Sequence, residues 1–576
     1  MMNRRELLQV LGAAAAVGFG TKAGAAQADP YAAAPPFKGP GAVSLLHMTD
    51  CHAQLLPMHF REPSVNLGFG AQQGQWPHLV GSALIKAAGL TPGTREAHAF
   101  TCLDFTAAAK RYGKVGGFAH LATLVKQMKA SRPGSLLLDG GDTWQGSASA
   151  LWTRGEDMVQ ACRLLGVDVM TGHWEFTLGQ DRVKELVDGP LKSGGIEFIA
   201  HNVKTQDFGD EVFASHVMRE INGVPVAIIG QAFPYTPIAN PRYLVPDWSF
   251  GIREPELQQL VDSVRAKGAQ LVVLLSHNGM DVDLKLASRV SGLDAILGGH
   301  THDGVPFGLP VANRGGHTLV CNAGSNGKFL GVLDVQVRNG KAAELKYQLL
   351  PVFANLLPAD KAMAELIARI RAPFAAKLAE PLAVSEGLLY RRGNFNGSWD
   401  QLLCDALMDV QGADIAFSPG FRWGTSLLPG DTITRELLMD QTAITYPNAT
   451  LTVMTGTQIK EVLEDVADNL FNPDPYYQQG GDMVRVGGLH YRCAPLAAMG
   501  SRITDMRLQG RPIEAAKTYK VAGWASVQEG GGAGNKPVWE LVEQWLKAQK
   551  GFVKPRVINS PDLVGAQGNP GITSEG

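Results

Sequence analysis

The sequence predicts an α/β protein with two domains. From about residue 41 to 350, short apolar runs alternate with amphipathic stretches, a pattern typical of a layered α/β domain. The chain has 576 residues, which is longer than a single hydrophobic core supports. Residues from about 380 to 560 mix helical and extended patterns again, with dense glycine-rich turns. The predicted fold class is therefore α/β within each domain and α+β overall.

Composition and charge exclude several classes of protein. Hydrophobic residues make up 45% of the chain, charged residues 18%, and the formal net charge is −2. These values exclude a disordered chain and a collagen. The charge gives no broad basic surface, so nucleic acid is not expected as a partner. The six cysteines are scattered, so we expect no zinc site on thiolates. One disulfide remains possible in an oxidising compartment, and the sequence does not indicate which cysteines would form it.

The N-terminal residues 1–28 are predicted to be an export signal. Arg4-Arg5, within the string NRRELLQ (3–9), is followed by an apolar run at 7–19, and Ala26-Gln27-Ala28 supplies a cleavage site. The arginine pair is similar to a bacterial twin-arginine signal, so we expect the periplasm as location. An uncleaved anchor is the alternative. No later segment is apolar enough for a membrane span in the mature chain, and residues 29–40 are expected to be a linker.

Six apolar runs in the first domain are predicted to be buried strands, at 44–48, 135–138, 168–170, 197–200, 224–229 and 270–275. In the stretch 257–267, four apolar side chains share one helical face. A further helix is predicted over 358–371, with Pro358 in its first turn. The expected domain organisation is a first domain at 41–352, a linker helix at 353–380, a second domain at 381–560 and a flexible tail at 561–576.

Polar side chains gather directly after five apolar runs. These clusters are Asp50-Cys51-His52, Gly140-Gly141-Asp142, Gly172-His173-Trp174-Glu175, Ser276-His277-Asn278 and Gly298-Gly299-His300-Thr301-His302. Ligands in α/β proteins collect at the carboxyl ends of parallel strands, so these clusters are expected to converge. Residues i and i+2 after a strand point to the same side. Imidazole and carboxylate donors suit Mn²⁺, although Zn²⁺ and Fe are not excluded. The clusters therefore predict a metal site.

The motif order D-x-H, G-G-D, G-N-H-E (here GHWE), S-H and G-H-T-H is that of the calcineurin-like metallophosphoesterases, which this sequence therefore resembles. The segments 412–416 (GADIA) and 420–422 (GFR) are similar to segments of the 5′-nucleotidase branch. The resemblance implies a four-layer α/β/β/α metallophosphoesterase-like domain, followed by a 5′-nucleotidase-type C-terminal α/β domain. It also implies two metal ions, the first held by Asp50, His52 and His302, the second by His173, His277 and His300, with Asp142 bridging them.

One segment departs from the nucleotidase pattern G-N-H-E. His173 stands where those enzymes have a metal-binding Asn, and Trp174 stands where they have a catalytic His. The string GHWEFT, together with DCHAQL at 50–55, is similar to the SoxB family of thiosulfohydrolases. This resemblance implies two Mn²⁺ ions and a partner, the carrier SoxYZ, which presents a cysteine S-thiosulfonate. It also implies that metal-activated hydroxide releases sulfate from this group, in the periplasmic sulfur-oxidation (Sox) pathway.

Two residues are predicted to serve the reaction beside the metal ligands. Arg422 offers a rigid set of donors that would grip the sulfonate. Trp174 stands in place of the imidazole that would act as general acid. A persulfide is a good leaving group and needs little protonation, so this imidazole is dispensable for the proposed reaction. The alternative function is a periplasmic 5′-nucleotidase or other metallophosphoesterase. That function needs an imidazole in place of Trp174 and an aromatic clamp for a base, and the second domain offers no convincing clamp.

Overall fold

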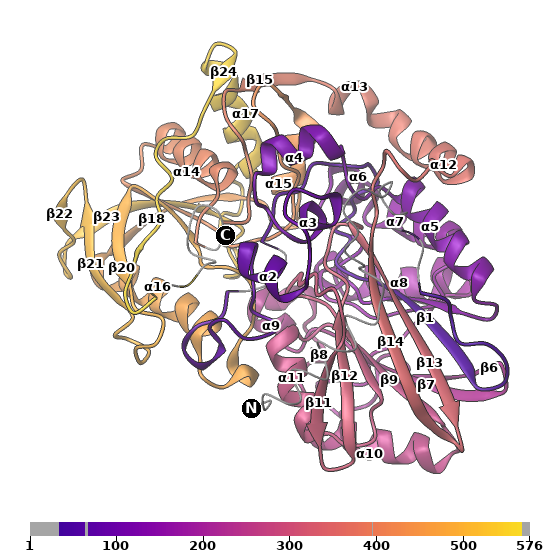
Figure 1. The fold of residues 1–576 in the computed structure, drawn as a ribbon. Coiled ribbons are helices and arrows are strands. Elements are labelled where there is room, and N and C mark those ends of the chain that lie inside the picture. Colours follow the sequence, from indigo (N-terminus) through magenta and orange to yellow (C-terminus); the bar gives the residue numbers. More distant parts are fainter. Residues whose placement is uncertain (1–30, 32–33, 64–66, 394, 567–568, 570–576) are drawn as a thin grey trace.

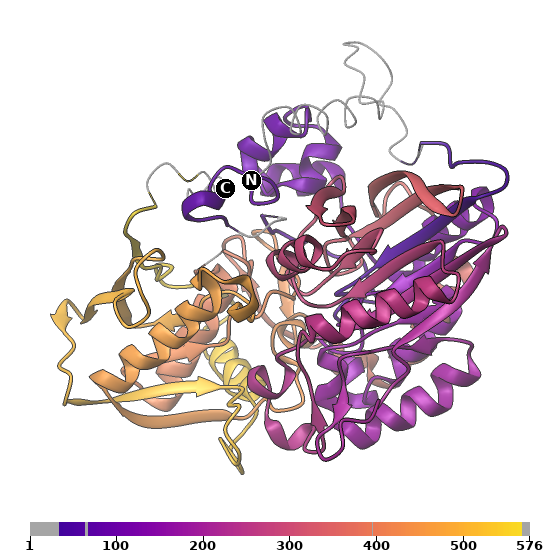
Figure 2. The ribbon, with the colours of Figure 1, turned by 90° about the horizontal axis from the view of Figure 1, so that it is seen from below.

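The computed structural model describes residues 31, 34–63, 67–393, 395–566 and 569. The predicted signal at 1–28 lies outside these residues. Two domains lie side by side, the first coloured indigo to pink and the second orange to yellow (Figures 1 and 2). Across the described residues, every helix is too short or too polar to span a bilayer.

The first domain contains two six-stranded sheets. Their strands are β1 (Ala42–Met48), β2 (Leu136–Asp139), β3 (Val169–Met170), β4 (Glu197–Phe198), β6 (His216–Ile221), β7 (Val224–Gln231), β9 (Leu271–Ser276), β10 (Ala295–Gly298), β11 (Leu309–Asn313), β12 (Gly316–Asn322), β13 (Phe329–Arg338) and β14 (Lys341–Pro351). The strand orders are β14-β13-β1-β2-β3-β4 and β11-β12-β10-β9-β7-β6. Strands β1 to β4 pair in parallel, as do β7, β9, β10 and β12. In each sheet, the carboxyl ends of several parallel strands therefore lie side by side at the same end of the sheet. Strands β5 (Lys204–Thr205) and β8 (Trp248–Ser249) form a separate two-stranded antiparallel sheet.

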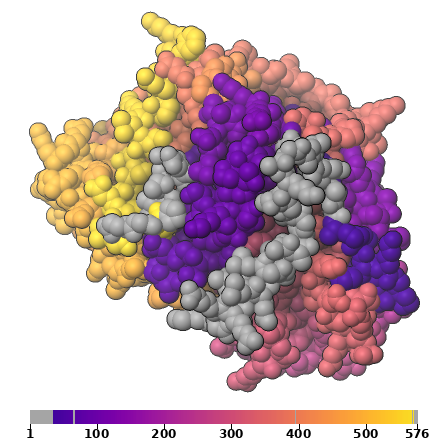
Figure 3. All heavy atoms as spheres, viewed as in Figure 1, coloured from indigo at the N-terminus to yellow at the C-terminus, as the bar shows by residue number. Residues whose placement is uncertain are grey.

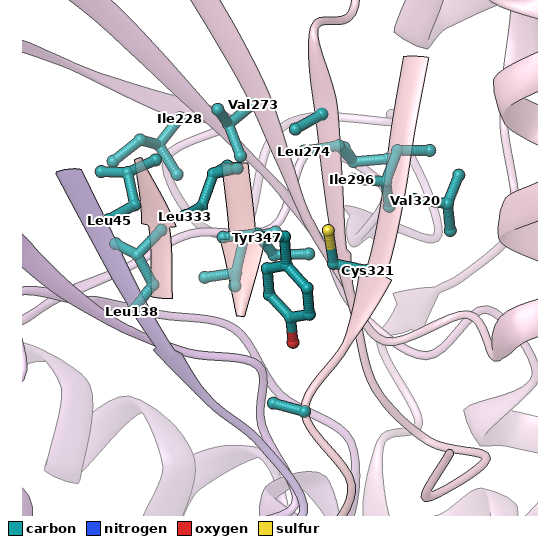
Figure 4. Close-up of a cluster of buried hydrophobic side chains, with 14 of the residues drawn as sticks. Leu45, Leu138, Ile228, Val273, Leu274, Ile296, Val320, Cys321, Leu333 and Tyr347 are labelled. Atoms are coloured by element: carbon teal, nitrogen blue, oxygen red, sulfur yellow. The ribbon is translucent and has the colours of Figure 1, made fainter. Parts of the chain in front are cut away.

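Alternation along β1 separates two cores. Leu45 packs in the core that also holds Ile228 and Val273 of the second sheet (Figure 4). Leu46 points the other way, because successive side chains of a strand face opposite sides. It packs in a core with helices α5 (Phe118–Ser131), α7 (Glu156–Leu165) and α12 (Lys361–Arg371). Helices α10 (Glu254–Ala266) and α11 (Met280–Arg289) pack on the second sheet. The four-layer α/β/β/α architecture is thus confirmed.

A helical insertion covers the junction of the domains. It consists of α2 (Gly81–Ala87), α3 (Arg95–Phe100) and α4 (Phe105–Tyr112), and in Figure 3 it forms the purple band across the middle of the face. Phe105 and Ala109 pack against Leu428 of the second domain. The remaining helices of the first domain are α6 (Ala148–Thr153), α8 (Gln180–Leu186) and α9 (Thr236–Ala239).

The helix predicted between the domains starts later than expected. Helix α12 begins at Lys361 and not at Pro358, because the Asp360 side chain caps it by accepting a hydrogen bond of 3.1 Å from the Met363 amide. The Pro358 carbonyl instead accepts a hydrogen bond from Thr123 Oγ1. Helix α13 (Ala375–Leu378) follows and leads into the second domain.

The second domain carries three small sheets. Its strands are β15 (Pro381–Ser385), β16 (Ile415–Ser418), β17 (Thr432–Thr434), β18 (Ala449–Thr455), β19 (Arg485–Gly487), β20 (Leu489–Cys493), β21 (Ile503–Leu508), β22 (Arg511–Pro512), β23 (Thr518–Trp524), β24 (Phe552–Val553) and β25 (Asp562–Leu563). The sheets have the orders β18-β23-β16-β19, β17-β15-β24 and β22-β21-β20-β25. The helices are α14 (Ser398–Gln411), α15 (Arg435–Thr442), α16 (Gly456–Phe471) and α17 (Val538–Ala548).

Part of the segment predicted to be a flexible tail is paired. Strand β25 lies parallel to β20, and the Val564 amide donates to the Cys493 carbonyl at 2.8 Å. The pairing uses backbone groups that β20 would otherwise leave unpaired at the edge of its sheet. All six cysteines have free, buried thiols, so the disulfide left open by the sequence is not formed.

The ion pair between Arg132 and Asp334 gives a stability prediction. It joins two guanidinium nitrogens to two carboxylate oxygens at 2.9 and 2.8 Å, with both side chains only 1% exposed. Asp334→Ala leaves a buried charge uncompensated, so we expect the free energy of unfolding to fall by about 3–5 kcal/mol. Thermal unfolding should detect this as a lower Tm. Glu365→Ala, which removes an exposed pair with Lys361, is the control and should leave the Tm unchanged. Equal effects of both substitutions would contradict the prediction.

Candidate metal centre

The predicted ligands lie in the loops after β1, β2, β3, β9 and β10, so both sheets contribute. Five of them adopt a positive φ, between 45° and 72°: Asp50, His52, Asp142, His300 and His302. Residues with a Cβ rarely adopt this conformation, which costs about 1–3 kcal/mol and concentrates at functional sites. The loops after β1, β2 and β10 therefore turn sharply after their strands, which brings these five side chains to the same centre.

The structure brings all seven predicted ligand residues together in two buried groups. Asp142, His173, His277 and His300 form one group, and Asp50, His52, Asp142 and His302 form the other. Within each group, the donor atoms lie within 4.8 Å of one another. Asp142 belongs to both groups, and its Oδ2 lies 3.0 Å from His277 Nε2 and 3.2 Å from His173 Nδ1. This is the arrangement of a two-metal site with a shared carboxylate.

The chemistry of these donors fits metal ions. Burial lowers the pKa of His52, His173, His300 and His302, so their imidazoles are neutral and carry a lone pair. Within the described part of the chain, one ring nitrogen of each of these four residues has no hydrogen-bond partner. For His300 this atom, Nδ1, is available to a cation. His52 and His302 instead turn Nε2 toward the centre, where the two Nε2 atoms lie 3.0 Å apart, and a coordinated cation would relieve the repulsion between their lone pairs.

His277 is held differently from the other four imidazoles. Burial alone would lower its pKa, but the Asp142 and Asp50 carboxylates outweigh this effect and raise the pKa to about 10. Its Nδ1 lies 2.6 Å from the Gly140 carbonyl. An N–H donated from Nδ1 to this acceptor leaves Nε2 to face the carboxylates, as is typical of metal-binding histidines.

No role was predicted for Glu175, whose carboxylate connects two of the ligand loops in the structure. Its buried carboxylate accepts hydrogen bonds from the backbone amides of Asp142, Thr143, Trp144 and His173, at 2.6 to 3.2 Å. One side chain thus ties the loop after β2 to the loop after β3. The glutamate in the GHWE string was the available signal, but nothing in the sequence indicated which amides it would bind.

Trp174 belongs to an aromatic cluster that joins the two domains. Its ring centroid lies 5.1 Å from that of Phe421, 5.0 Å from Trp423 and 6.0 Å from Tyr446. Trp423 also stacks on the His52 ring, with centroids 4.9 Å apart. The Trp174 amide donates to Asp142 Oδ1 at 2.8 Å. The indole therefore lines one wall of the centre and offers no group that titrates near neutral pH.

Arg422 reaches from the second domain to the ligand loop of the first. Its guanidinium donates to the His300 carbonyl at 2.8 Å and to the Thr301 carbonyl at 3.3 Å. Burial lowers its pKa to about 10, so the side chain stays cationic at neutral pH. Binding of a sulfonate by Arg422 stays a prediction. The structure shows in addition that Arg422 supports the loop that carries His300 and His302.

A cleft of about 820 Å³ opens between the domains beside the centre. Asn278 and Thr301 line it from the first domain, and Gly480 from the second. Large apolar side chains also line it: Leu67, Phe69, Phe395, Phe471, Leu496 and Met499. Its four charged lining residues are all paired, Asp281 with His78, Asp468 with Arg502, and Asp482 with Arg485.

Comparisons with known proteins agree with this architecture. The family model of the 5′-nucleotidase C-terminal domain matches residues 389–536. The protein UshA of Yersinia enterocolitica is 25% identical over 468 residues, which cover 70% of this chain and 80% of that protein. The solved structure of the sulfate thiohydrolase SoxB of Thermus thermophilus is 37% identical, has a TM-score of 0.86, and is matched over 92% of this chain and 98% of that one. A 5′-nucleotidase precursor of the same organism has a TM-score of 0.71 at 22% identity, with 91% and 99% coverage, and shows the shared fold.

The fold and the donor set together define a metal-dependent hydrolase of the 5′-nucleotidase and calcineurin-like metallophosphoesterase superfamily. Within this superfamily, identity and coverage single out one branch. The chain belongs to the SoxB family.

Proposed function

We propose that this protein is a thiosulfohydrolase that releases sulfate from a cysteine S-thiosulfonate presented by a carrier protein, with two Mn²⁺ ions at the centre. Asp50, His52 and His302 would hold one ion, His173, His277 and His300 the other, and Asp142 both. The carrier would be SoxYZ, as in the Sox pathway, and the reaction would take place in the periplasm after export by the twin-arginine route.

Trp174 is the observation that carries the proposal. Phosphomonoester hydrolysis by the related nucleotidases relies on an imidazole at this position, because an alkoxide leaving group needs a proton. Here an indole fixed among Phe421, Trp423 and Tyr446 occupies it. The five histidines of the centre all belong to the two ligand groups. The site is therefore suited to a substrate whose leaving group departs without a proton donor.

A thiosulfonate meets this requirement. In R–S–S–SO₃⁻, water attacks the terminal sulfur, an S–O bond forms and the S–S bond breaks. The electron pair of that bond stays on the persulfide, R–S–S⁻, and sulfate leaves with the loss of two protons at neutral pH. Metal ions at such a site supply Lewis acidity and activated water. The residues of the chain would hold the tetrahedral group in place, with Arg422 as a fixed cation bonded to the ligand loop.

The lining of the cleft is compatible with a carrier-bound substrate. Arg502, the cation that lines it among the described residues, is already bonded to Asp468 at 2.6 Å. An uncharged extended peptide needs apolar walls and backbone partners, which this cleft offers, while Phe69, Phe395 and Phe471 are also able to stack on a nucleobase. The similarity to UshA and to other 5′-nucleotidases keeps nucleotide hydrolysis as the second candidate.

A model substrate tests the proposal. Tetrathionate converts the cysteine of a glycine-rich peptide into an S-thiosulfonate with release of thiosulfate. We expect the Mn²⁺-loaded protein to release one sulfate per peptide, measured by ion chromatography, and to leave a persulfide that cyanide converts to thiocyanate. The same peptide without protein is the blank. If no sulfate appears above that blank, the proposed activity is wrong.

A further inference from the structure

We propose that the loop 478–482 of the second domain is part of the metal centre, because its backbone positions the His300 ring for metal binding. The inference rests on the two-metal assignment above. It concerns Gln479 and Gly480, which the sequence motifs do not mark and which contribute no side-chain ligand. Both act on the centre through His300, so they are positioning residues.

The contact lies between the His300 ring and the Gln479 backbone. His300 Nε2 lies 2.8 Å from the Gln479 carbonyl, which can only accept a hydrogen bond. This acceptor fixes the proton of the neutral imidazole on Nε2. His300 Nδ1 is buried and has no partner in the described part of the chain. Its lone pair is thus free for the metal that His173, His277 and Asp142 share. A carbonyl from the second domain therefore selects the tautomer that can coordinate.

Glycine at position 480 makes this approach possible. Gly480 has a φ of +73°, and a Cβ there would lie 2.5 Å from His300 Nε2 and 2.8 Å from His300 Cδ2. A separation below 3.0 Å forces the ring or the loop to move. The next residue, Gly481, has a φ of +86° but nothing within 4 Å of such a Cβ. Gly480 and Gly481 thus both have a positive φ, but only a Cβ at position 480 would contact the His300 ring.

The preceding segment of the second domain is fastened to the first domain, which fixes the position of the loop. Asp474 accepts from Lys285 Nζ at 2.5 Å, and Tyr476 donates its hydroxyl to Glu254 at 2.7 Å. The Tyr235 hydroxyl donates to the Tyr476 carbonyl. Arg422 holds the opposite side of the ligand loop through the His300 and Thr301 carbonyls. His300 is therefore held from two sides by the second domain.

The matched pair Gly480→Ala and Gly481→Ala tests the proposal by metal binding. Mn²⁺ is titrated into the metal-free proteins, and bound metal is followed by elemental analysis and by the EPR signal of a spin-coupled Mn²⁺ pair. We expect Gly480→Ala to weaken one of the two sites by about 10–100-fold, the effect typical of lost support for a ligand. The coupled signal should give way to that of isolated Mn²⁺. Gly481→Ala should bind two ions as the wild type does.

The outcomes separate this inference from the proposed function. Equal affinities in wild type and both variants, or equal losses in both variants, would overturn the inference, because contact with His300 would then not matter. A wild type that binds fewer than two ions would overturn the two-metal proposal and this inference with it. Should Gly480→Ala fail to fold, Tyr476→Phe decides. It removes one anchor of the segment and should weaken the same site several-fold, and unchanged affinity would refute the inference.

Discussion

Asp142→Asn is expected to remove most of the activity. The Asp142 carboxylate belongs to both ligand groups, and its Oδ2 faces His173, His277 and His52 at 3.2, 3.0 and 3.8 Å. An amide has the same shape but no charge, so both sites should bind metal less tightly. Metal ions supply several kcal/mol of transition-state stabilisation, and each 1.36 kcal/mol is a factor of ten in rate. We expect kcat for sulfate release to fall by at least ~10³-fold, with metal content below two per chain.

Asp281→Asn is the matched control for this prediction. Asp281 lines the cleft and pairs with His78 at 2.9 Å, but it lies outside both ligand groups. We expect it to keep both metals and an activity within a few-fold of wild type. Elemental analysis and steady-state kinetics are measured on the same preparations. An Asp142→Asn protein with two bound metals and wild-type turnover would show that the shared carboxylate is not a ligand.

Trp174→His is expected to change the preferred substrate. The substitution places an imidazole next to His173, at the position that corresponds to the catalytic histidine of the nucleotidase pattern G-N-H-E. General acid catalysis contributes about 10²–10⁴-fold, so phosphate release from AMP should rise by up to this factor over wild type. Sulfate release should fall, because the ring packed against Phe421, Trp423 and Tyr446 is lost. Replacement of such a buried ring by a smaller one also lowers stability, by less than the ~3–5 kcal/mol typical of a Trp→Ala change.

Trp174→Phe separates the two effects. Phenylalanine loses part of the packing but introduces no titratable group, so it should lower sulfate release without any gain in phosphatase activity. Both activities are measured as full kcat/KM values at several pH values, because an acting imidazole adds a pH dependence. If Trp174→His gains no phosphatase activity and keeps full sulfate release, the indole is not the determinant of substrate class.

The ligand set could be predicted because its signals are local. Each cluster directly follows an apolar strand, and parallel strands of one sheet bring their carboxyl ends together, so Asp50 and Asp142 are expected to converge. The inclusion of His277, which follows a strand of the second sheet, came from the resemblance to the metallophosphoesterases. The apolar runs predicted β1 to β4, β7 and β9 but not β6 or β10 to β14, and the helix was expected to start at Pro358, because proline suits a first turn. The Asp360 cap overrode that preference.

The contacts between the domains could not be predicted. The stacking of Trp423 on His52 and the hydrogen bond from His300 to Gln479 join residues that are far apart in sequence. No periodicity or motif encodes such a pairing, since it depends on how the second domain packs against the first. The positive φ values of the ligand loops also escape sequence rules, because histidine and aspartate rarely adopt them and do so here under tertiary constraint.

The most direct test of the central claim offers both substrates to one preparation. The Mn²⁺-loaded protein is incubated with equal concentrations of the S-thiosulfonate peptide and AMP, and sulfate and phosphate are measured together by ion chromatography, with Asp142→Asn as the blank. We predict sulfate release with little phosphate, as expected for a site with an indole at position 174. Phosphate release without sulfate would contradict the account and assign the protein to nucleotide hydrolysis.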